Sequence, residues 1–164
     1  MKAEKGFTLV EILIVVVILG ILAAIVIPQF TSASTEAKES SLTSDLQAVR
    51  SQIELYKIHH NDMLPGTQGE NFVTAMTSKT NQDGVVDTSG GTDPTFKFGP
   101  YMRAIPPNPF NDFATVSEGV TAIVGQGDNS TGWHFVTSGV DAGLFQPNDD
   151  KANPLDPADW HTGY

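Results

Sequence analysis

The stretch from Phe7 to Phe30 reads FTLVEILIVVVILGILAAIVIPQF and decides the fold of this chain. Residues 12–35, which overlap it, carry no charge at all. At 1.5 Å per residue these residues form roughly 36 Å of helix, which is enough to cross a hydrocarbon core of about 30 Å. The alternative is a buried core helix, but the chain offers no other apolar helices to surround it. The sequence therefore predicts a membrane-spanning helix.

The residues before and after the apolar run indicate its orientation and its processing. Lys2 and Lys5 precede the run and the remainder of the chain is acidic, so we expect the amino terminus on the cytoplasmic side and the head outside the cytoplasm. No small-residue cleavage pattern of a secretory signal follows the run. A small residue, Gly6, stands before it instead. Cleavage after Gly6 would keep the apolar segment and make Phe7 the new amino terminus.

Glu11 is the one charged residue inside the apolar run. A carboxylate in this position costs about 2.5–3.5 kcal/mol on membrane-insertion scales, so a partner is expected. Two explanations stay open: Glu11 lies near the membrane interface and reaches the headgroups, or it pairs with a cation of another chain. Cleavage after Gly6 would supply such a cation, because a free α-amine has a pKa of about 7.7–8.0.

A second helical pattern follows Pro28, which has no backbone donor and is expected to kink or locally melt the helix. Apolar residues then recur at steps of three and four, with charged residues between them. Residues 31–60 are therefore predicted to form an amphipathic helix, and His59 and His60 are interpreted as its polar end. The members of the apolar stripe are Phe30, Ala33, Ala37, Leu42, Leu46, Val49, Ile53 and Tyr56.

Residues 61–164 form the predicted head, with an acidic carboxy-terminal loop. Residues 71–79 favour one short helix, whereas residues 121–124 and 132–137 are rich in β-branched and aromatic side chains and favour strands. The glycine-containing residues 125–129 between them suggest a hairpin connection. The expected fold class is α+β: a long N-terminal helix, first transmembrane and then amphipathic, packed on a small antiparallel sheet.

Composition excludes several classes of function. Nineteen acidic residues against nine basic ones give a net charge of −10, which disfavours binding to nucleic acid. The chain has no cysteine, so disulfides, thiolate metal sites and cysteine nucleophiles are excluded. A phosphate-binding loop, a nucleophile elbow, a zinc-protease helix and a dinucleotide fingerprint are all absent from the sequence. We therefore expect a protein that is not an enzyme.

The segment KGFTLVEILIVVVILGILAAIVIP, from Lys5 to Pro28, resembles the N-terminal signature of type IV pilins and type II secretion pseudopilins. The resemblance implies that a prepilin peptidase removes residues 1–6 as a leader by cutting after Gly6, and that Phe7 is then N-methylated. It also implies that residues 7–30 serve as transmembrane and assembly helix. Glu11 matches the glutamate that registers subunits by pairing with a neighbouring amino terminus.

A second resemblance lies in Gly99-Pro100-Tyr101 and Ile105-Pro106-Pro107-Asn108-Pro109-Phe110. This segment is similar to one in the major, G-type pseudopilin of type II secretion, with Asn108 in place of an aspartate and Phe110 in place of a tryptophan. Together with the missing cysteines, it favours a pseudopilus subunit that drives protein export. The alternative is a type IV pilin of a surface fibre for adhesion or motility.

The resemblance also implies partners and a location. The subunit would be a single-pass protein of the cytoplasmic (inner) membrane before assembly. Afterwards it would be part of a periplasmic or extracellular homopolymer filament. Its implied partners are the prepilin peptidase, the inner-membrane assembly platform and minor pseudopilins.

The stretch SGVDAGLFQPNDD, Ser138–Asp150, resembles the calcium loop of major pseudopilins. By that resemblance Asp141, Asp149 and Asp150 would supply carboxylates and Leu144 a carbonyl, and calcium takes six to eight such oxygens. A glycine-rich hairpin with Asp149 and Asp150 in solvent is the alternative. The sequence contains no EF-hand loop.

Overall fold

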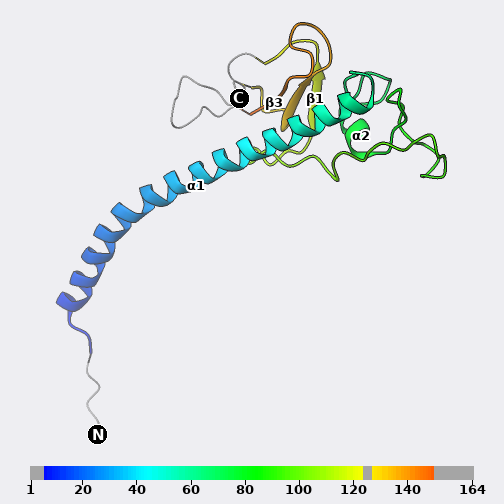
Figure 1. The fold of residues 1–164 in the computed structure, drawn as a ribbon. Coiled ribbons are helices and arrows are strands. Elements are labelled where there is room, and N and C mark those ends of the chain that lie inside the picture. The colour runs from blue at the N-terminus through cyan, green and yellow to red at the C-terminus, as the bar shows by residue number, and fades with distance from the viewer. Residues whose placement is uncertain (1–5, 124–126, 150–164) are drawn as a thin grey trace. The chain divides into compact units, whose positions relative to one another are not determined.

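The computed structural model describes residues 6–123 and 127–149 (Figure 1). Its elements are α1 (Leu9–His59), α2 (Phe72–Thr77), β1 (Val116–Gly119), β2 (Trp133–Val136) and β3 (Phe145–Pro147). The chain divides into two compact units, one ending at Ala37 and the other beginning at Lys38. The long apolar helix and the small sheet confirm the expected α+β class.

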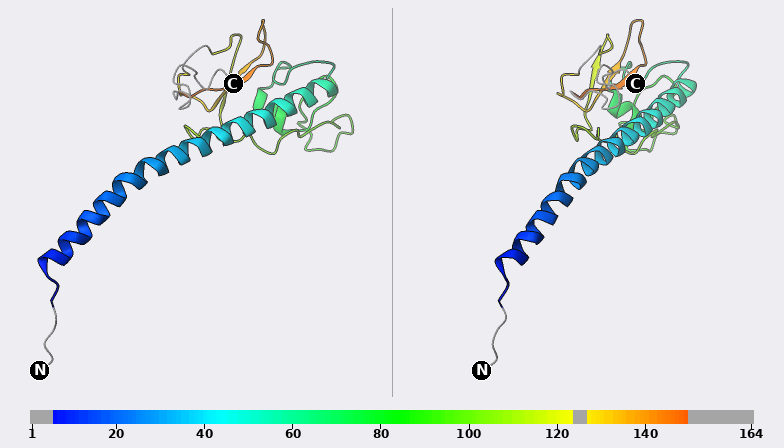
Figure 2. Two further views of the ribbon diagram at one scale, coloured as in Figure 1. Left: turned by 60° about the vertical axis from the view of Figure 1, so that its left-hand side comes forward. Right: turned by 90° about the vertical axis from the view of Figure 1, so that its left-hand side faces the viewer.

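The first unit contains the apolar part of α1, the one described helix long and apolar enough to cross a membrane. Its side chains are exposed from Leu9 onward, including Phe30 at 73%. The helix continues through Pro28, so the expected local melting does not occur (Figure 2). Two hydroxyls bond back to carbonyls in this turn: Thr31 Oγ1 donates to Ile27 O at 3.2 Å and Ser32 Oγ donates to Pro28 O at 3.2 Å.

The core of the second unit begins with the predicted apolar stripe of α1. Five stripe members from Leu42 to Tyr56 are at most 2% exposed, which confirms this part of the amphipathic pattern. Aromatic rings complete the core: the Phe72 ring centroid lies 4.5 Å from that of Phe135. The core cluster contains Leu42, Leu46, Val49, Ile53, Tyr56, Phe72, Ala75, Met76, Tyr101, Ile105, Trp133, Phe135 and Phe145.

The sheet has the strand order β1-β2-β3 and is mixed, not purely antiparallel as expected. Strand β2 is antiparallel to β3, with Trp133 opposite Pro147. Strand β1 is parallel to β2, with Val116 opposite Trp133. A parallel pair cannot be joined by a hairpin, so the predicted hairpin connection before residue 132 is wrong. The helix predicted within residues 71–79 and the strand predicted within 132–137 are confirmed.

The strand expected at residues 121–124 is absent from its described part, residues 121–123. Side chains on the sheet satisfy this backbone instead. The Gln146 amide accepts from Ile123 N–H at 2.9 Å and donates to Ile123 O at 3.0 Å. His134 Nε2 lies 2.9 Å from Thr121 O. Because side chains take these backbone groups, the segment lies against the sheet without extending its ladder.

Candidate assembly site at the start of α1

The first turn of α1 contains a reciprocal capping arrangement between Thr8 and Glu11. Helix α1 begins at Leu9, so Thr8 is the N-cap and Glu11 is the third helical residue. The Glu11 N–H donates to Thr8 Oγ1 at 3.2 Å. The Thr8 N–H and the Thr8 hydroxyl both donate to Glu11 Oε2 at 2.8 Å. This is a capping box, which satisfies backbone donors that a helix start otherwise leaves unpaired.

The capping box gives Glu11 a role that the sequence reasoning missed. The signal was present as Thr8-Leu9-Val10-Glu11 directly before an apolar run. The carboxylate lies where the helix dipole favours a negative charge. The dipole of its own helix therefore offsets part of the free-energy cost of a carboxylate in the apolar run. Among the described residues its hydrogen bonds go to Oε2, which leaves Oε1 for a further partner.

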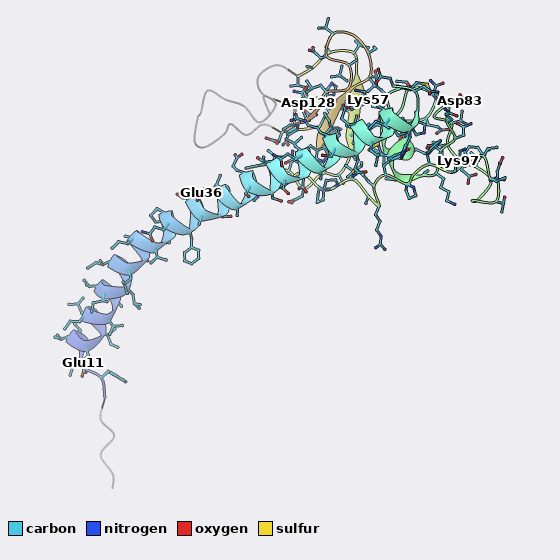
Figure 3. All side chains as sticks on the ribbon, viewed as in Figure 1. Glu11, Glu36, Lys57, Asp83, Lys97 and Asp128 are labelled. Carbon is cyan, nitrogen blue, oxygen red and sulfur yellow. The ribbon has the colours of Figure 1, made fainter. Side chains whose placement is uncertain are left out.

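Glu11 is also isolated from other charges along α1. Figure 3 shows Glu11 in the first turn and Glu36 as the next labelled charged side chain, and no residue between them is charged. Phe7, which would become the amino terminus after cleavage, is 84% exposed and directly precedes the N-cap. The start of α1 therefore presents one carboxylate beside a large exposed apolar surface, an arrangement suited to registering one helix against another.

The proposed calcium residues are not gathered in the described part of the chain. Asp141 lies in an exposed turn before β3, and Leu144 directly precedes that strand. The glycine-rich hairpin of the alternative is confirmed, because β2 and β3 pair antiparallel across residues 137–144. Asp149 follows β3 and is 1% exposed, so only its expected position in solvent is wrong. Asp150 lies outside the described residues.

The intervening strand sets the spacing of these oxygens. At about 3.3 Å per residue, the extended chain from Leu144 to Asp149 spans on the order of 15 Å. Within residues 6–123 and 127–149, no three His, Asp or Glu side chains form a group that could hold a metal. Calcium binding stays a prediction.

Comparison with known proteins places the chain in a family. Residues 1–27 match the family model described as the prokaryotic N-terminal methylation motif. The type II secretion system core protein G of Vibrio cholerae is 30% identical over 120 residues, which cover 73% of this chain and 75% of that protein. Its counterpart from Klebsiella michiganensis is 31% identical over 122 residues, covering 72% and 77%. The chain belongs to the core protein G family.

A further member of the core protein G family matches over a shorter stretch at higher identity. The Pseudomonas aeruginosa member is 45% identical over 67 residues, which span 41% of this chain and 46% of that protein. The methylation motif includes Gly6, Phe7 and Glu11. No solved structure matches the chain significantly. The cleavage, methylation and registration roles of these residues remain predictions.

A buried amide network holds the carboxy-terminal side of this core protein G head. Asn108 is fully buried, and its Nδ2 donates to Gly132 O at 2.9 Å and to Asp149 Oδ2 at 2.8 Å. Asn148 Nδ2 donates to Asp128 Oδ1 at 2.7 Å. Hydrogen bonds from the backbone and hydroxyl of Ser130, and from Asn148, hold the pKa of the Asp128 carboxyl below its usual value. The network connects the proline-rich segment to the residue before β2 and to the residues after β3.

Proposed function

We propose that this chain is a structural subunit of the type II secretion pseudopilus, a helical filament that drives protein export. The observation that carries the proposal is the apolar surface of α1, which is exposed from Leu9 to Phe30 and has no partner among the described residues. Large exposed apolar surfaces mark sites of membrane or protein contact. Membership of the core protein G family supports the pseudopilus as the final assembly.

The same apolar surface serves two successive environments. Before assembly, α1 anchors the subunit as a single pass in the cytoplasmic membrane, with the head outside the cytoplasm. Burial of apolar surface is worth about 25 cal/mol per Å², so extraction from lipid requires reburial against other subunits. Contacts between different faces of identical subunits need not close into a ring, and they generate a helical array.

The polar start of α1 then sets the register between subunits. A prepilin peptidase cuts after Gly6, and Phe7 receives a methyl group on its amine. In the filament the amine of a neighbouring subunit pairs with Glu11 Oε1, while Oε2 remains in the cap with Thr8. Extraction and growth require an inner-membrane assembly platform, and minor pseudopilins complete the filament. None of these steps assigns catalysis to the chain.

A type IV pilin of a surface fibre is the second candidate. The methylation motif at residues 1–27 favours it as much as it favours a pseudopilin. The relatives named type II secretion system core protein G favour the pseudopilus. The two candidates share the same assembly site, so the experiment on Glu11 tests the subunit role in both.

The Glu11→Ala variant tests the assembly site. We expect it to insert into the membrane and to be cleaved, because insertion depends on the apolar run. Filament yield should fall at least about tenfold, the factor that corresponds to about 1.4 kcal/mol per contact. The measurements are the intact mass of the membrane-extracted protein, which reports loss of residues 1–6 and methylation of Phe7, and the sheared filament fraction.

Glu36→Ala is the matched control, because it removes a carboxylate from the same helix outside the apolar run. We expect this variant to assemble normally. A normal filament yield from Glu11→Ala would overturn the registration role. An intact mass that retains residues 1–6 in the wild-type filament would overturn the processing step.

A further inference from the structure

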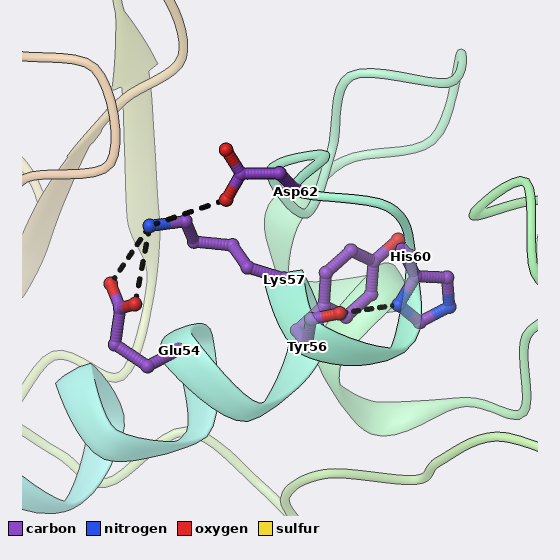
Figure 4. A network of polar contacts seen from close by, with 5 residues as sticks. All are labelled: Glu54, Tyr56, Lys57, His60 and Asp62. Carbon is purple, nitrogen blue, oxygen red and sulfur yellow. Dashed lines mark hydrogen bonds and ion pairs between the residues drawn. The ribbon is translucent and has the colours of Figure 1, made fainter.

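His60 is the residue that directly follows α1, and its side chain is 0% exposed. From the sequence it is interpreted as part of a polar helix end, and the structure shows that its ring is buried. Its Nδ1 lies 2.7 Å from Tyr56 O (Figure 4), and its Nε2 lies 2.9 Å from Thr80 Oγ1. A carbonyl only accepts, so Nδ1 carries the hydrogen. Nε2 of the neutral ring then accepts from the Thr80 hydroxyl, a tautomer assigned from these partners.

Aromatic rings pack around the imidazole. From α1, the Tyr56 ring stacks on it at 3.8 Å between centroids, and His59 adds a neighbouring titratable ring. From the segment 96–102, the rings of Phe98 and Tyr101 lie edge-on at 5.5 and 5.9 Å. Lys97 Nζ lies 5.8 Å from the Phe98 ring centroid.

The carboxylates near the end of α1 and on the loop after Thr80 pair with Lys57 or are exposed to solvent. Figure 4 shows Lys57 Nζ directed to Glu54 at 3.2 Å and to Asp62 at 3.8 Å, away from the His60 ring. Asp83, on the loop after Thr80, is exposed. Among the residues that the structure describes, no carboxylate contacts His60. A positive charge on this ring would therefore face no carboxylate, and only the backbone groups of Tyr56 and Asn81 would favour it.

The hydroxyl that His60 binds belongs to the residue that joins two loop segments. Thr80 N–H donates to Phe98 O at 2.9 Å, and Phe98 N–H donates to Thr80 O at 3.1 Å. Thr80 also pairs with Val86 and is 0% exposed. His60 thus connects the end of α1 to the point where the segments 78–86 and 96–101 meet.

We propose that His60 is an acid-sensitive latch between the end of α1 and the loop segments joined at Thr80. In the neutral ring Nε2 accepts the Thr80 hydroxyl hydrogen and the latch is closed. A proton on Nε2 turns this acceptor into a donor, so the Thr80 hydroxyl must redirect its own hydrogen inside a buried site. Protonation also places an unpaired cation among aromatic rings. The latch belongs to the head alone and does not depend on filament assembly.

The direction of the pH dependence follows from linkage. Burial lowers the pKa of His60 from its usual value of about 6.5, and His59 lowers it further, while backbone hydrogen bonds with Tyr56 and Asn81 act in the opposite direction. Between the lowered folded pKa and about 6.5, the unfolded chain binds more protons than the folded chain. Stability is therefore retained above this window and is lost as the pH falls through it.

The test compares melting temperatures of the full chain in detergent micelles at pH 7.5 and 5.5, followed by near-ultraviolet circular dichroism. We expect the wild type to melt about 3–6 °C lower at pH 5.5. His60→Phe keeps a ring on Tyr56 but cannot titrate, so this acid-induced decrease should be absent. The control His59→Phe should retain it. Equal decreases in wild type and His60→Phe would overturn the proposal.

A second measurement on the wild type covers the case in which His60→Phe does not fold. Isotope-labelled histidine rings can be titrated by nuclear magnetic resonance in the same micelles. We expect the His60 ring to take up its proton only below pH 6.5, and the protection of the Thr80 and Phe98 amides against hydrogen exchange to decrease at pH 5.5. A His60 ring that titrates at or above pH 6.5, or unchanged protection of both amides, would contradict the latch.

Discussion

Asn108 shows how much one buried side chain contributes to this head. Its amide nitrogen donates to Gly132 O and to the Asp149 carboxylate, and its Oδ1 accepts from Phe110 N–H at 2.9 Å. The similar pseudopilin segment has an aspartate at this position. An ionised aspartate here would place two carboxylates in contact, whereas the amide of Asn108 supplies Asp149 with a neutral donor.

We expect Asn108→Ala to lower the free energy of unfolding by about 2–4 kcal/mol, because it removes one hydrogen bond each from a buried carboxylate, a carbonyl and an N–H. Urea denaturation of the full chain in micelles measures the effect. Ser130→Ala, which removes an exposed hydroxyl bonded to Asp128, is the control and should change stability by less than about 0.5 kcal/mol. A loss below about 1 kcal/mol for Asn108→Ala would show that the amide bonds are replaced by water.

At the scale of elements, α1 and the sheet are joined by a polar contact as well as by the core. Arg50 projects from the buried side of α1, and its Nε and Nη2 donate to Phe145 O at 3.1 and 2.8 Å. Phe145 begins β3, an edge strand of the sheet. The guanidinium therefore satisfies a carbonyl at an edge that would otherwise be open to pairing.

The Arg50 contact predicts losses of unfolding free energy that differ in size among three substitutions. Arg50→Met should cost about 1.5–3 kcal/mol of unfolding free energy, the usual range for a hydrogen bond to a charged group. Arg50→Lys should recover only part of this loss, because a lysine lacks the planar pair of donors. Lys57→Met, on the same helix, breaks ion pairs with the exposed Glu54 and Asp62 and should cost less than about 1 kcal/mol. Equal losses in Arg50→Met and Lys57→Met would show that the contact with Phe145 contributes little.

At the scale of the whole molecule, burial separates the two units. Among the described residues before Lys38 none is buried, and the core begins at Leu42. The head contains its own helix face, sheet and polar network. The unit that ends at Ala37 offers an apolar surface and no core of its own. The first unit therefore needs an apolar environment, whereas the head can be surrounded by water.

We expect a variant that lacks residues 1–37 to be a soluble monomer, because no core residue is removed. It should melt cooperatively, within about 5 °C of the head transition of the full chain. The full chain should need lipid, detergent or filament contacts to remain dispersed. Size-exclusion chromatography and calorimetry measure these properties. Aggregation or non-cooperative melting of the variant would show that the head requires the N-terminal unit.

The helix could be predicted well because its signals are local. The apolar run from Phe7 to Phe30 and the stripe from Leu42 to Tyr56 are periodic over adjacent turns, and the structure confirms both as helix. The capping pattern of Thr8 and Glu11 is equally local in the sequence, although the helix start was not predicted from it. The strand at β1 was missed because its residues, Val-Ser-Glu-Gly, show little of the alternation typical of a strand.

The amino-acid sequence by itself determined the long helix, its apolar surface and the family of the chain, because each depends on residues close together along the chain. Only the tertiary structure decided the parallel pairing of β1 with β2 and the burial of Asn108 and His60. The partners of these two side chains, Asp149 and Thr80, lie 41 and 20 residues away. Such contacts arise from chain folding over long loops, and no local periodicity encodes them.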